Sequence, residues 1–508
     1  TLALCLYFWP CTNHYFSRFF FLRRLGAAFS SCTKPKHMAQ PVTSRQSIFS
    51  FIKESLQSEG QDYTQGSLRR AVFLLAIPMI AEMMMESVFA VVDLYFVGHL
   101  EDSSYAVQTV GLTESVLTLI YSLAIGISMA ATAIVARRTG EKDADGAARS
   151  GAQSIVLGVG VALVLSLVGM WFAPDVLRLM GAEAKTVTMG TPYVRIMMGS
   201  TTAIMLLFLI NGIFRGVGDA AMAMRSLWLA NVCNIVLCPL FIRGLGPIPA
   251  LGLTGAAVAT TIGRSAGVVY QLYYLLRGSA QLHMKAVHFK PYAQQIRAIV
   301  RIAAPGTLQF VIASCSWIFL ARMVAQSGGD EASAGYQTGI RIILFFLLPA
   351  WGLSNAAATL VGQNLGAGLP GRAEASVMAT ARYNTIFMGI VTLVIQLLAP
   401  FIVGVFTTNA AVQQYAVQTM RIISAGYIFY GIGMVMANAF NGAGDTWTPT
   451  WINLGGFWAF QIPLAYVLAI VWSWGPIGVF IAVPVAETGI ALAAYVLFKR
   501  GKWKEKKV

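Results

Sequence analysis

Twelve long apolar segments, separated by short polar links, constrain the fold of this chain more than any other feature. A helix that crosses a bilayer needs about 20 consecutive, predominantly apolar residues. Such a helix also satisfies its own backbone hydrogen bonds, which lipid cannot do. We therefore predict an all-α, polytopic membrane protein. Its transmembrane helices are expected at 71–98, 107–136, 150–173, 192–214, 222–242, 252–276, 299–324, 335–360, 377–404, 415–440, 450–473 and 477–498.

The composition agrees with a protein embedded in lipid. Hydrophobic residues make up 57% of the chain and charged residues only 11%, against about 25% charged residues in a soluble protein. The net charge of +15 does not indicate nucleic-acid binding, because the basic residues lie in short links between apolar segments. No polar stretch is long enough to form a soluble domain, and the six cysteines lack the spacing of a zinc site or a disulfide framework.

Lysine and arginine accumulate on one side of the predicted helices, and links of this kind stay in the cytoplasm. The links that follow the even-numbered helices, together with both ends of the chain, hold most of these residues. The opposite links hold few, chiefly Arg178, Lys185 and Arg243. We expect a multi-pass protein of the cell's inner (plasma) membrane, with both termini in the cytoplasm.

The composition also divides the chain into regions. We expect an N-terminal leader and cytoplasmic tail at 1–66, a first lobe at 67–277, a connector at 278–297, a second lobe at 298–498 and a basic tail at 499–508. Residues 1–37 look foreign to the rest of the chain, and the first methionine is Met38. We interpret them as an upstream translation, because a signal peptide would place its basic residues before the apolar run, whereas here they come after it.

The two halves of the chain repeat one another. LAIP at 75–78 matches IAAP at 302–305, and FRGVGD at 214–219 matches FNGAGD at 440–445. GISMAATAIVARRTG at 126–140 matches GLSNAAATLVGQNLG at 352–366, and ALG at 250–252 matches PIG at 476–478 weakly. The shift is constant at 226–227 residues, and each half holds six helices. We therefore expect two lobes in the same orientation, with any transport site between or inside them near the midplane.

Three carboxylates interrupt the first apolar segment. Glu82, Glu86 and Asp93 fall on one narrow face of a helix, because successive residues are about 100° apart. A charged side chain facing lipid costs about 3 kcal/mol or more at the helix centre, so this face should look into protein or a water-filled cavity. The acids are candidates for proton or cation binding, or they are paired or protonated and serve helix packing. Asp93 aligns with Leu320, so the acidic face belongs to the first half only.

Four features of the sequence recur together: VVDLYFVGHL, the paired FxGxGD turns, NIVLCPLFIRGLGPIPALGLTGAAVAT at 234–260 and GLSNAAATLVGQNLGAG at 352–368. In this order they resemble the multidrug and toxic compound extrusion (MATE) family, and the resemblance covers about residues 67–498. It implies twelve helices in two pseudo-symmetric six-helix lobes. It also implies export of organic, often cationic, compounds, driven by entry of protons or sodium ions. In the family's ion site, matching positions are Asp93, Asn234, position 238 and Thr260.

The sequence departs from the family pattern at position 238, which holds Cys238 in place of an Asp. Sodium prefers hard oxygen ligands, and a thiol is a poor substitute. This departure favours protons over sodium as the coupling ion, carried by Asp93 alone or with help from Glu86. We expect no other cofactor. Asn234 and Thr260 are explained equally well by hydrogen bonds between helices.

Other residues are weaker candidates. Methionine repacks easily around varied ligands, and aromatic faces attract cations. A substrate cavity could therefore include Met84, Tyr336, Trp351 and Gln309, although single aromatic residues in membrane helices more often serve packing. The GxGD turns also occur in intramembrane aspartyl proteases, but a glycine turn followed by an Asp helix cap explains them more simply.

Together these features predict a secondary active antiporter, not an enzyme, that exports hydrophobic or cationic drug-like compounds. The two lobes would rock between alternating states, with the first helix bending near Pro78, where a helix hydrogen bond is lost. The alternatives are a flippase of lipid-linked precursors, which would need a cavity rich in arginine and lysine, a membrane-embedded enzyme, and a channel. We expect a monomer that interacts with small molecules and the lipid bilayer, and not with nucleic acid.

Overall fold

The computed structural model describes residues 48–57, 61–98, 100, 103–244, 249–278 and 282–506. The expected leader at 1–37 lies outside the described residues, and so does the side chain of Asp93. Within the described ranges the chain is helical and forms no strand. The predicted all-α fold is therefore confirmed.

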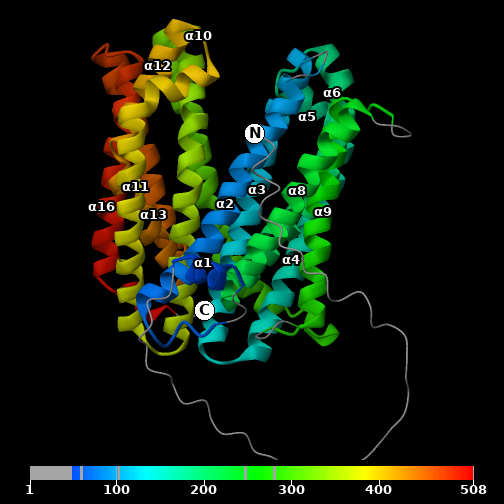
Figure 1. The fold of residues 1–508 in the computed structure, drawn as a ribbon, viewed down its shortest axis with the longest axis vertical. Helices are drawn as coiled ribbons and strands as arrows, with labels where there is room; N and C mark the ends of the chain where they lie inside the picture. The colour runs from blue at the N-terminus through cyan, green and yellow to red at the C-terminus, as the bar shows by residue number, and fades with distance from the viewer. Residues whose placement is uncertain are drawn as a thin grey trace, which may run out of the picture. The chain divides into compact units, whose positions relative to one another are not determined.

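Most of the first half of the described chain packs around one hydrophobic core, while the start of α2 packs in a separate core with Ala220 and with Leu353, Ala356 and Leu360 of the second half. Its helices are α1 (Ile48–Gln57), α2 (Leu68–Gly98), α3 (Ser103–Gly140), α4 (Ala144–Trp171), α5 (Ala173–Leu179), α6 (Ala184–Gly199), α7 (Thr201–Val217), α8 (Ala220–Arg243) and α9 (Leu253–Arg277). Figure 1 shows α2 to α9, in blue to green, as one bundle.

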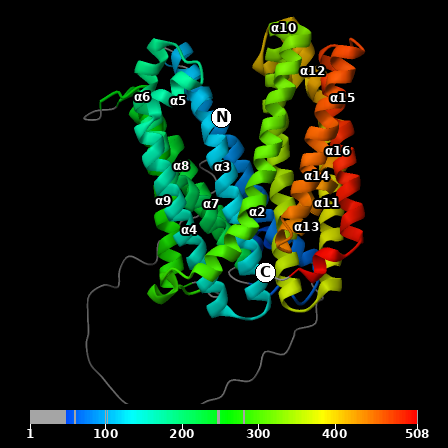
Figure 2. The same cartoon turned by 180° about the vertical axis from the view of Figure 1, so that it is seen from behind.

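The second half forms a further bundle with two cores of its own. A short connector turn, η2 (Ala286–Phe289), leads into α10 (Ala293–Gly366), α11 (Pro370–Phe406), α12 (Ala410–Ser424), α13 (Tyr427–Gly442), α14 (Trp447–Asn453), η3 (Leu454–Gln461), α15 (Ile462–Tyr466), η4 (Val467–Val471), α16 (Pro476–Lys499) and η5 (Lys502–Glu505). Seen from behind, these helices again lie beside those of the first half (Figure 2).

These helices account for the twelve predicted spans. In the described residues, nine helices are long and apolar enough to cross a membrane, and the pair α12 and α13, bent by 57°, adds a tenth. The 74 residues of α10 contain two spans, joined at Gly329, whose backbone leaves the helical region (φ 71°, ψ −162°). The remaining span is α9, which is 25 residues long but carries several polar residues. The exact region boundaries predicted from composition stay predictions.

The helix ends differ most from expectation in the fourth span. It was expected at 192–214, whereas α6 and α7 together cover 184–217. The first turns of α6 are polar, so hydropathy alone does not mark them as part of the span. They are nevertheless packed against α3, where the Thr186 hydroxyl donates to Gln108 Oε1 at 2.8 Å.

The two bundles meet along four glycines that the repeat relates in pairs, and we call these residues the glycine seam: Gly126 with Gly352, and Gly140 with Gly366. A Cβ atom on Gly140 would lie 2.0 Å from the Gln363 carbonyl oxygen, and one on Gly366 would lie 2.1 Å from that of Arg137. A Cβ on Gly126 or on Gly352 would likewise lie 2.6 Å or less from atoms of the opposite bundle. The helices thus pack backbone to backbone, as small residues allow in membranes.

The seam contacts are reciprocal, because each glycine of a pair touches the half that the other belongs to. The sequence repeat is therefore a structural repeat, and the prediction of two pseudo-symmetric lobes is confirmed. We call them the first lobe (α2–α9) and the second lobe (α10–α16).

The lobes are also joined by hydrogen bonds at the end of the molecule where α3, α7 and α10 finish, which we call the basic end. The Thr359 hydroxyl donates to the Arg215 carbonyl at 3.0 Å, and Gln363 Nε2 donates to the Gly216 carbonyl at 3.0 Å. Arg372 donates to the carbonyls of Gln65 at 2.8 Å and Gly66 at 3.0 Å, just before α2 begins. α1 and the C-terminus lie at this same end (Figure 1).

The two FxGxGD turns have the same backbone conformation. Gly218 and Gly444 both adopt a positive φ, of 91° and 82°, which glycine tolerates without strain. Asp219 caps α8 by accepting a hydrogen bond from the Met222 amide at 3.0 Å, as predicted. Asp445 instead accepts from the Thr448 hydroxyl at 2.7 Å.

The weak match of ALG with PIG was aligned wrongly. The structural counterpart of Gly252 is Gly475, because both precede a span as its N-cap and have similar dihedral angles (φ 54°, ψ −133° and φ 63°, ψ −146°). The shift is therefore 223 residues here. The link between the fifth and sixth spans of the first lobe is longer than its counterpart in the second lobe, and the extra residues change the register.

The glycine seam leads to a direct prediction. Replacing Gly366 with alanine places a Cβ against the Arg137 carbonyl, so the lobes must move apart at the basic end. We expect Gly366→Ala to lower the free energy of unfolding by about 1–3 kcal/mol, measured as a lower unfolding temperature in detergent. Gly389→Ala on α11, where a Cβ meets open space, is the matched control. Equal unfolding temperatures for the two variants would contradict the seam.

Candidate functional site

Two of the three predicted acids lie inside the first lobe and are each paired with an arginine. Glu86 accepts from Arg264 Nη2 at 2.7 Å and from Arg264 Nη1 at 3.3 Å, so α2 and α9 are joined by a two-pronged ion pair. The Arg264 side chain is only 2% exposed. Its guanidinium also lies over the Phe89 ring, 4.9 Å from the ring centre.

Glu82 lies one turn earlier on α2 and is buried. Its Oε1 accepts from Asn211 Nδ2 at 3.0 Å and from Arg215 Nη1 at 3.3 Å, both on α7. Its second oxygen, Oε2, has no hydrogen-bond partner among the described residues. This carboxyl group can therefore carry a proton on Oε2 without breaking a bond that the structure contains.

A chain of amide and hydroxyl groups extends the Glu82 pair across the lobe. Asn211 Oδ1 accepts from Gln271 Nε2 of α9 at 2.6 Å and from the Ser226 hydroxyl of α8 at 2.9 Å. All three residues are buried. Since buried polar groups are stable only when they are hydrogen-bonded, this network fixes how α2, α7, α8 and α9 pack.

The residues suggested by the family resemblance lie beside this network. Asn234 Nδ2 of α8 donates to the Thr260 hydroxyl of α9 at 2.9 Å, and both side chains are buried. Asn231, three residues earlier on α8, donates to Glu86 Oε2 at 3.1 Å. Cys238 is buried one turn beyond Asn234. The helices thus place the asparagine and threonine pair close to the Glu86 pair.

The remaining predicted ion-site residue, Asp93, is in α2, seven residues after Glu86. Its side chain lies outside the described residues, so its role stays a prediction. The described residues include no group of three His, Cys, Asp or Glu side chains that could hold a metal ion.

Three of the four suggested cavity residues pack against other side chains or lie at the surface. Tyr336 is buried and stacks on Phe480 with ring centres 5.9 Å apart, and the Trp351 ring stacks 5.4 Å from that of Phe310. Met84 is 52% exposed. None of the three lines either of the two pockets described below. Their contact with substrate stays a prediction.

The fourth, Gln309, is the counterpart of Glu82 under the repeat, and Asn441 is the counterpart of Arg215. These two amides hydrogen-bond to each other in the second lobe, with Gln309 Nε2 donating to Asn441 Oδ1 at 3.2 Å. The ion pair of the first lobe is therefore replaced by a neutral pair at the equivalent place. This observation gives physical form to the predicted asymmetry, in which the acidic face of the first helix has no acidic counterpart in the second half.

Sequence reasoning missed the basic partners. Arg215 directly follows the expected span 192–214, where the sequence groups it with the basic residues of a cytoplasmic link, and nothing in the sequence identifies a partner for Arg264 inside the span 252–276. Helical spacing was the available signal for these two arginines. Arg264 and Gln271 are two turns apart on one face of α9, and Asn211 and Arg215 are one turn apart on one face of α7. Which face of α2 they meet depends on the packing of four helices.

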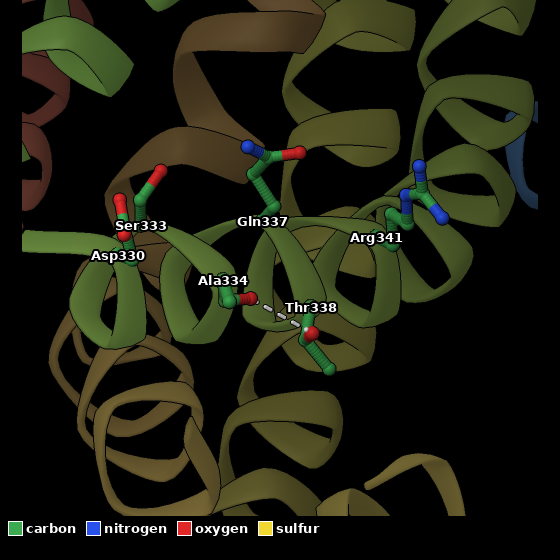
Figure 3. Close-up of a pocket in the computed structure, with 6 residues that line it drawn as sticks. All are labelled: Asp330, Ser333, Ala334, Gln337, Thr338 and Arg341. Carbon is green, nitrogen blue, oxygen red and sulfur yellow. Dashed lines mark hydrogen bonds between the residues drawn. The ribbon is translucent and has the colours of Figure 1, made fainter. Parts of the chain in front are cut away.

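Two pockets stand out in the described part of the chain. One has a volume of about 360 Å³ and is lined by α10 residues Asp330, Ser333, Ala334, Gln337, Thr338 and Arg341 (Figure 3). The other has a volume of about 510 Å³ and is lined by α10 residues and by the region around Pro463, namely Phe319, Arg322, Met323, Gln326, Ile462, Pro463, Tyr466 and Val467.

Comparison with known proteins agrees with this architecture. The family model MatE matches residues 78–240 and again 305–467, once in each lobe. A probable multidrug resistance protein, YoeA of Bacillus subtilis, is 24% identical over 451 residues, which cover 88% of this chain and 97% of that protein. The multidrug export protein MepA of Staphylococcus aureus is 24% identical over 84% of this chain and 93% of its own length.

Solved structures share the fold. An outward-facing conformation of a multidrug resistance MATE family transporter superposes with a TM-score of 0.83 at 24% identity, covering 89% of this chain and 99% of that one. A transporter of the MOP superfamily from Pyrococcus furiosus gives the same TM-score, identity and coverage. With the family model covering more than half of its residues in two repeats, this chain belongs to the MATE family of transporters.

Proposed function

We propose that this chain is an antiporter that exports drug-like organic compounds in exchange for protons. The observation that carries the proposal is the pairing of Glu82 and Glu86 with two arginines inside the first lobe, with a neutral amide pair at the place of Glu82 and Arg215 in the second. Acids inside a membrane protein are expensive and mark ion pathways. The relatives named for multidrug resistance or export support drug-like compounds as the substrate class.

The proposed orientation places the basic end in the cytoplasm. Links rich in lysine and arginine stay on the cytoplasmic side of a membrane, and the hydrogen bonds between the lobes lie at that end. The side chains of the opposite end would then face outward, and the inner or plasma membrane is the expected location.

Proton binding would act on the ion pairs of the first lobe. A proton on Glu86 removes the negative charge that Arg264 faces, and leaves a buried guanidinium without a counterion. Such a charge is costly away from water, so the lobe is driven to rearrange. The added positive charge also disfavours a cationic substrate nearby. Asp93, two turns further along α2, is the third acid proposed to take part.

Protons rather than sodium ions fit the residues that are present. The family pattern has an Asp at position 238, and Cys238 is a poor ligand for sodium. The carboxylates of Glu82 and Glu86 are already engaged with arginines and asparagines, which compete with a metal cation for the same oxygens.

Alternating access requires the lobes to separate at the basic end. The contacts of the glycine seam and the hydrogen bonds of Arg372 would then break. At the opposite end of the molecule, α3 and α10 would approach each other. Pro78 is well placed to assist, because the neighbouring Met79 carbonyl is the group that a Cβ on Gly352 would meet, at 2.4 Å. A bend of α2 at Pro78 would therefore change the seam directly.

The flippase alternative gains no support from the first lobe. Arg215 and Arg264 are both engaged by carboxylates, so they are not available to bind a pyrophosphate. An enzyme is excluded by family, since MATE proteins are transporters.

Transport measured in proteoliposomes tests the proposal. We expect the full chain to export a fluorescent organic cation when a proton gradient is imposed, and not when a sodium gradient is imposed alone. Glu86→Gln and Asp93→Asn should each reduce the rate at least tenfold, because neither amide can exchange a proton. Transport on sodium alone would contradict proton coupling. Absence of transport under both gradients, with folded protein, would favour the flippase.

The ion pair itself can be tested by stability. We expect Glu86→Gln to lower the free energy of unfolding by about 3–5 kcal/mol, because Arg264 stays charged and loses its partner. The double variant Glu86→Gln with Arg264→Gln removes both charges and should recover most of this loss. Thermal unfolding of the two single variants and the double variant gives the coupling. Additive losses would show that the two side chains do not interact.

A further inference from the structure

Two segments near the ends of the chain lie at the basic end of the molecule, outside the membrane-spanning helices. We call residues 61–67 the N-terminal strap and residues 500–506 the C-terminal strap. Each strap is anchored in its own lobe and accepts hydrogen bonds from an arginine of the other lobe. The straps therefore join the two lobes beside the glycine seam.

The C-terminal strap is anchored in the second lobe by Trp503. This side chain is fully buried and stacks on Phe498 of α16, with ring centres 4.8 Å apart and planes 13° from parallel. Its Nε1 donates to the Phe498 carbonyl at 2.9 Å. The next residue, Lys504, donates to Glu374 of α11 at 2.6 Å. These contacts hold the strap to α11 and α16, so it moves with the second lobe.

The end of this strap reaches the first lobe at Arg137, which lies close to the end of α3. Arg137 Nη2 donates to the Lys506 carbonyl at 2.6 Å. The Lys506 ammonium lies 3.3 Å from Oδ1 of Asp445, in the second FxGxGD turn. One residue of the strap thus connects an aspartate of its own lobe with an arginine of the other lobe.

The repeat shows that this connection is specific to one half of the molecule. Arg137 and Gln363 are counterparts, since 126–140 matches 352–366. Gln363 donates directly to the Gly216 carbonyl of the opposite lobe. Arg137 reaches the opposite lobe through the strap. One of these two related contacts between the lobes therefore depends on a segment that lies beyond the last repeated helix.

The N-terminal strap has the reciprocal arrangement. Tyr63 is buried, and its hydroxyl donates to the Gly218 carbonyl of the first lobe at 3.2 Å. Asp62 accepts from Lys142 of the first lobe at 2.7 Å. Arg372 of the second lobe donates to the Tyr63 carbonyl at 3.2 Å and to the carbonyls of two later residues of the strap. This strap therefore moves with the first lobe.

The basic end cannot open while the arginines stay bonded, because each arginine and its strap belong to different lobes. A hydrogen bond from a guanidinium is stronger than one between neutral groups. Its net worth is nevertheless modest, since water replaces the partner when the bond breaks. Such bonds shift the balance between a closed and an open basic end without making opening impossible.

We propose that the C-terminal strap is a latch, which holds the basic end closed until the hydrogen bond between Arg137 and the Lys506 carbonyl breaks. Release of the latch favours the state that opens toward the cytoplasm. The inference rests on the proposed alternating access and adds a conformational device outside the transport path. Loss of the latch changes the proportions of the two states and leaves the ion pairs of Glu82 and Glu86 in place.

The distance between the lobes tests the latch. A keto amino acid that carries a spin label replaces Ala144 at the start of α4 and Ala375 on α11, two exposed residues of different lobes at the basic end. This chemistry leaves the native cysteines unchanged. Distances between the labels are measured by double electron–electron resonance on the full chain in lipid nanodiscs.

Two changes remove the latch in different ways. One variant is a chain that ends at Gly501, and the other is Arg137→Gln in the full chain. Because Arg137→Gln keeps the Trp503 anchor, it tests the latch even if the shortened chain fails to fold. Arg138→Gln is the matched control, since Arg138 donates to Glu141 of its own lobe at 2.8 Å.

We expect each of the two changes to raise the ratio of long to short distances about fivefold or more, and Arg138→Gln to leave this ratio unchanged. Combining the two changes should add nothing, because both remove the same hydrogen bond. A further rise in the combined variant would overturn the latch, since Arg137 would then act without the strap. Equal ratios in the unaltered chain and in Arg137→Gln would overturn it as well.

Export of a fluorescent organic cation, measured with the same proteins, separates failure of the latch from failure of the proposed function. If the unaltered chain exports the cation and the distances do not respond to either change, only the latch is wrong. If the unaltered chain exports nothing and both changes lengthen the distances, the latch stands and the export function fails. Absence of both effects rejects both.

Discussion

A carboxylate in a membrane helix needs a partner, and much of the first lobe follows from this requirement. Glu82 and Glu86 lie on one face of α2, and each is met by an arginine from a different helix, α7 for one and α9 for the other. The pairs, with the amides around them, set the position of α2 relative to three neighbours. Apolar packing alone would allow these helices to rotate or slide, because lipid and leucine are nearly equivalent surroundings.

The second lobe has the same frame but no carboxylate at the equivalent place. Gln309 and Asn441 occupy the places of Glu82 and Arg215 and form a neutral pair. A neutral amide pair can hold two helices together, but it has no proton to exchange near physiological pH. The two lobes therefore share their packing and differ in their chemistry at this place, and the proposed proton coupling assigns proton exchange to the first lobe.

Most of the fold could be predicted from the sequence, but only part of the candidate site could. Length and hydropathy predicted twelve helices, and the constant shift predicted two lobes, since both depend on local composition and on order along the chain. The acids of α2 were visible because charge in an apolar run is conspicuous. Arg215 was not recognised as a partner, because its place near a helix end resembles that of a topological arginine. The alignment of ALG with PIG was wrong for a different reason. A fixed shift of 226 residues does not take account of the shorter loop before Gly475.

The glycine seam also bears on how the two halves have been free to diverge. At Gly140 and Gly366 the contact on the opposite side is a carbonyl group of the backbone, so no exchange of side chains in the other half can make room for a larger residue. A side-chain pair such as Glu82 with Arg215 can be replaced as a unit, and its counterpart in the second lobe has a different chemistry. This difference explains why the sequence repeat is still recognisable along α3 and α10 at the glycine seam. At the side-chain pairs Glu82 with Arg215 and Gln309 with Asn441, the two halves have different residues.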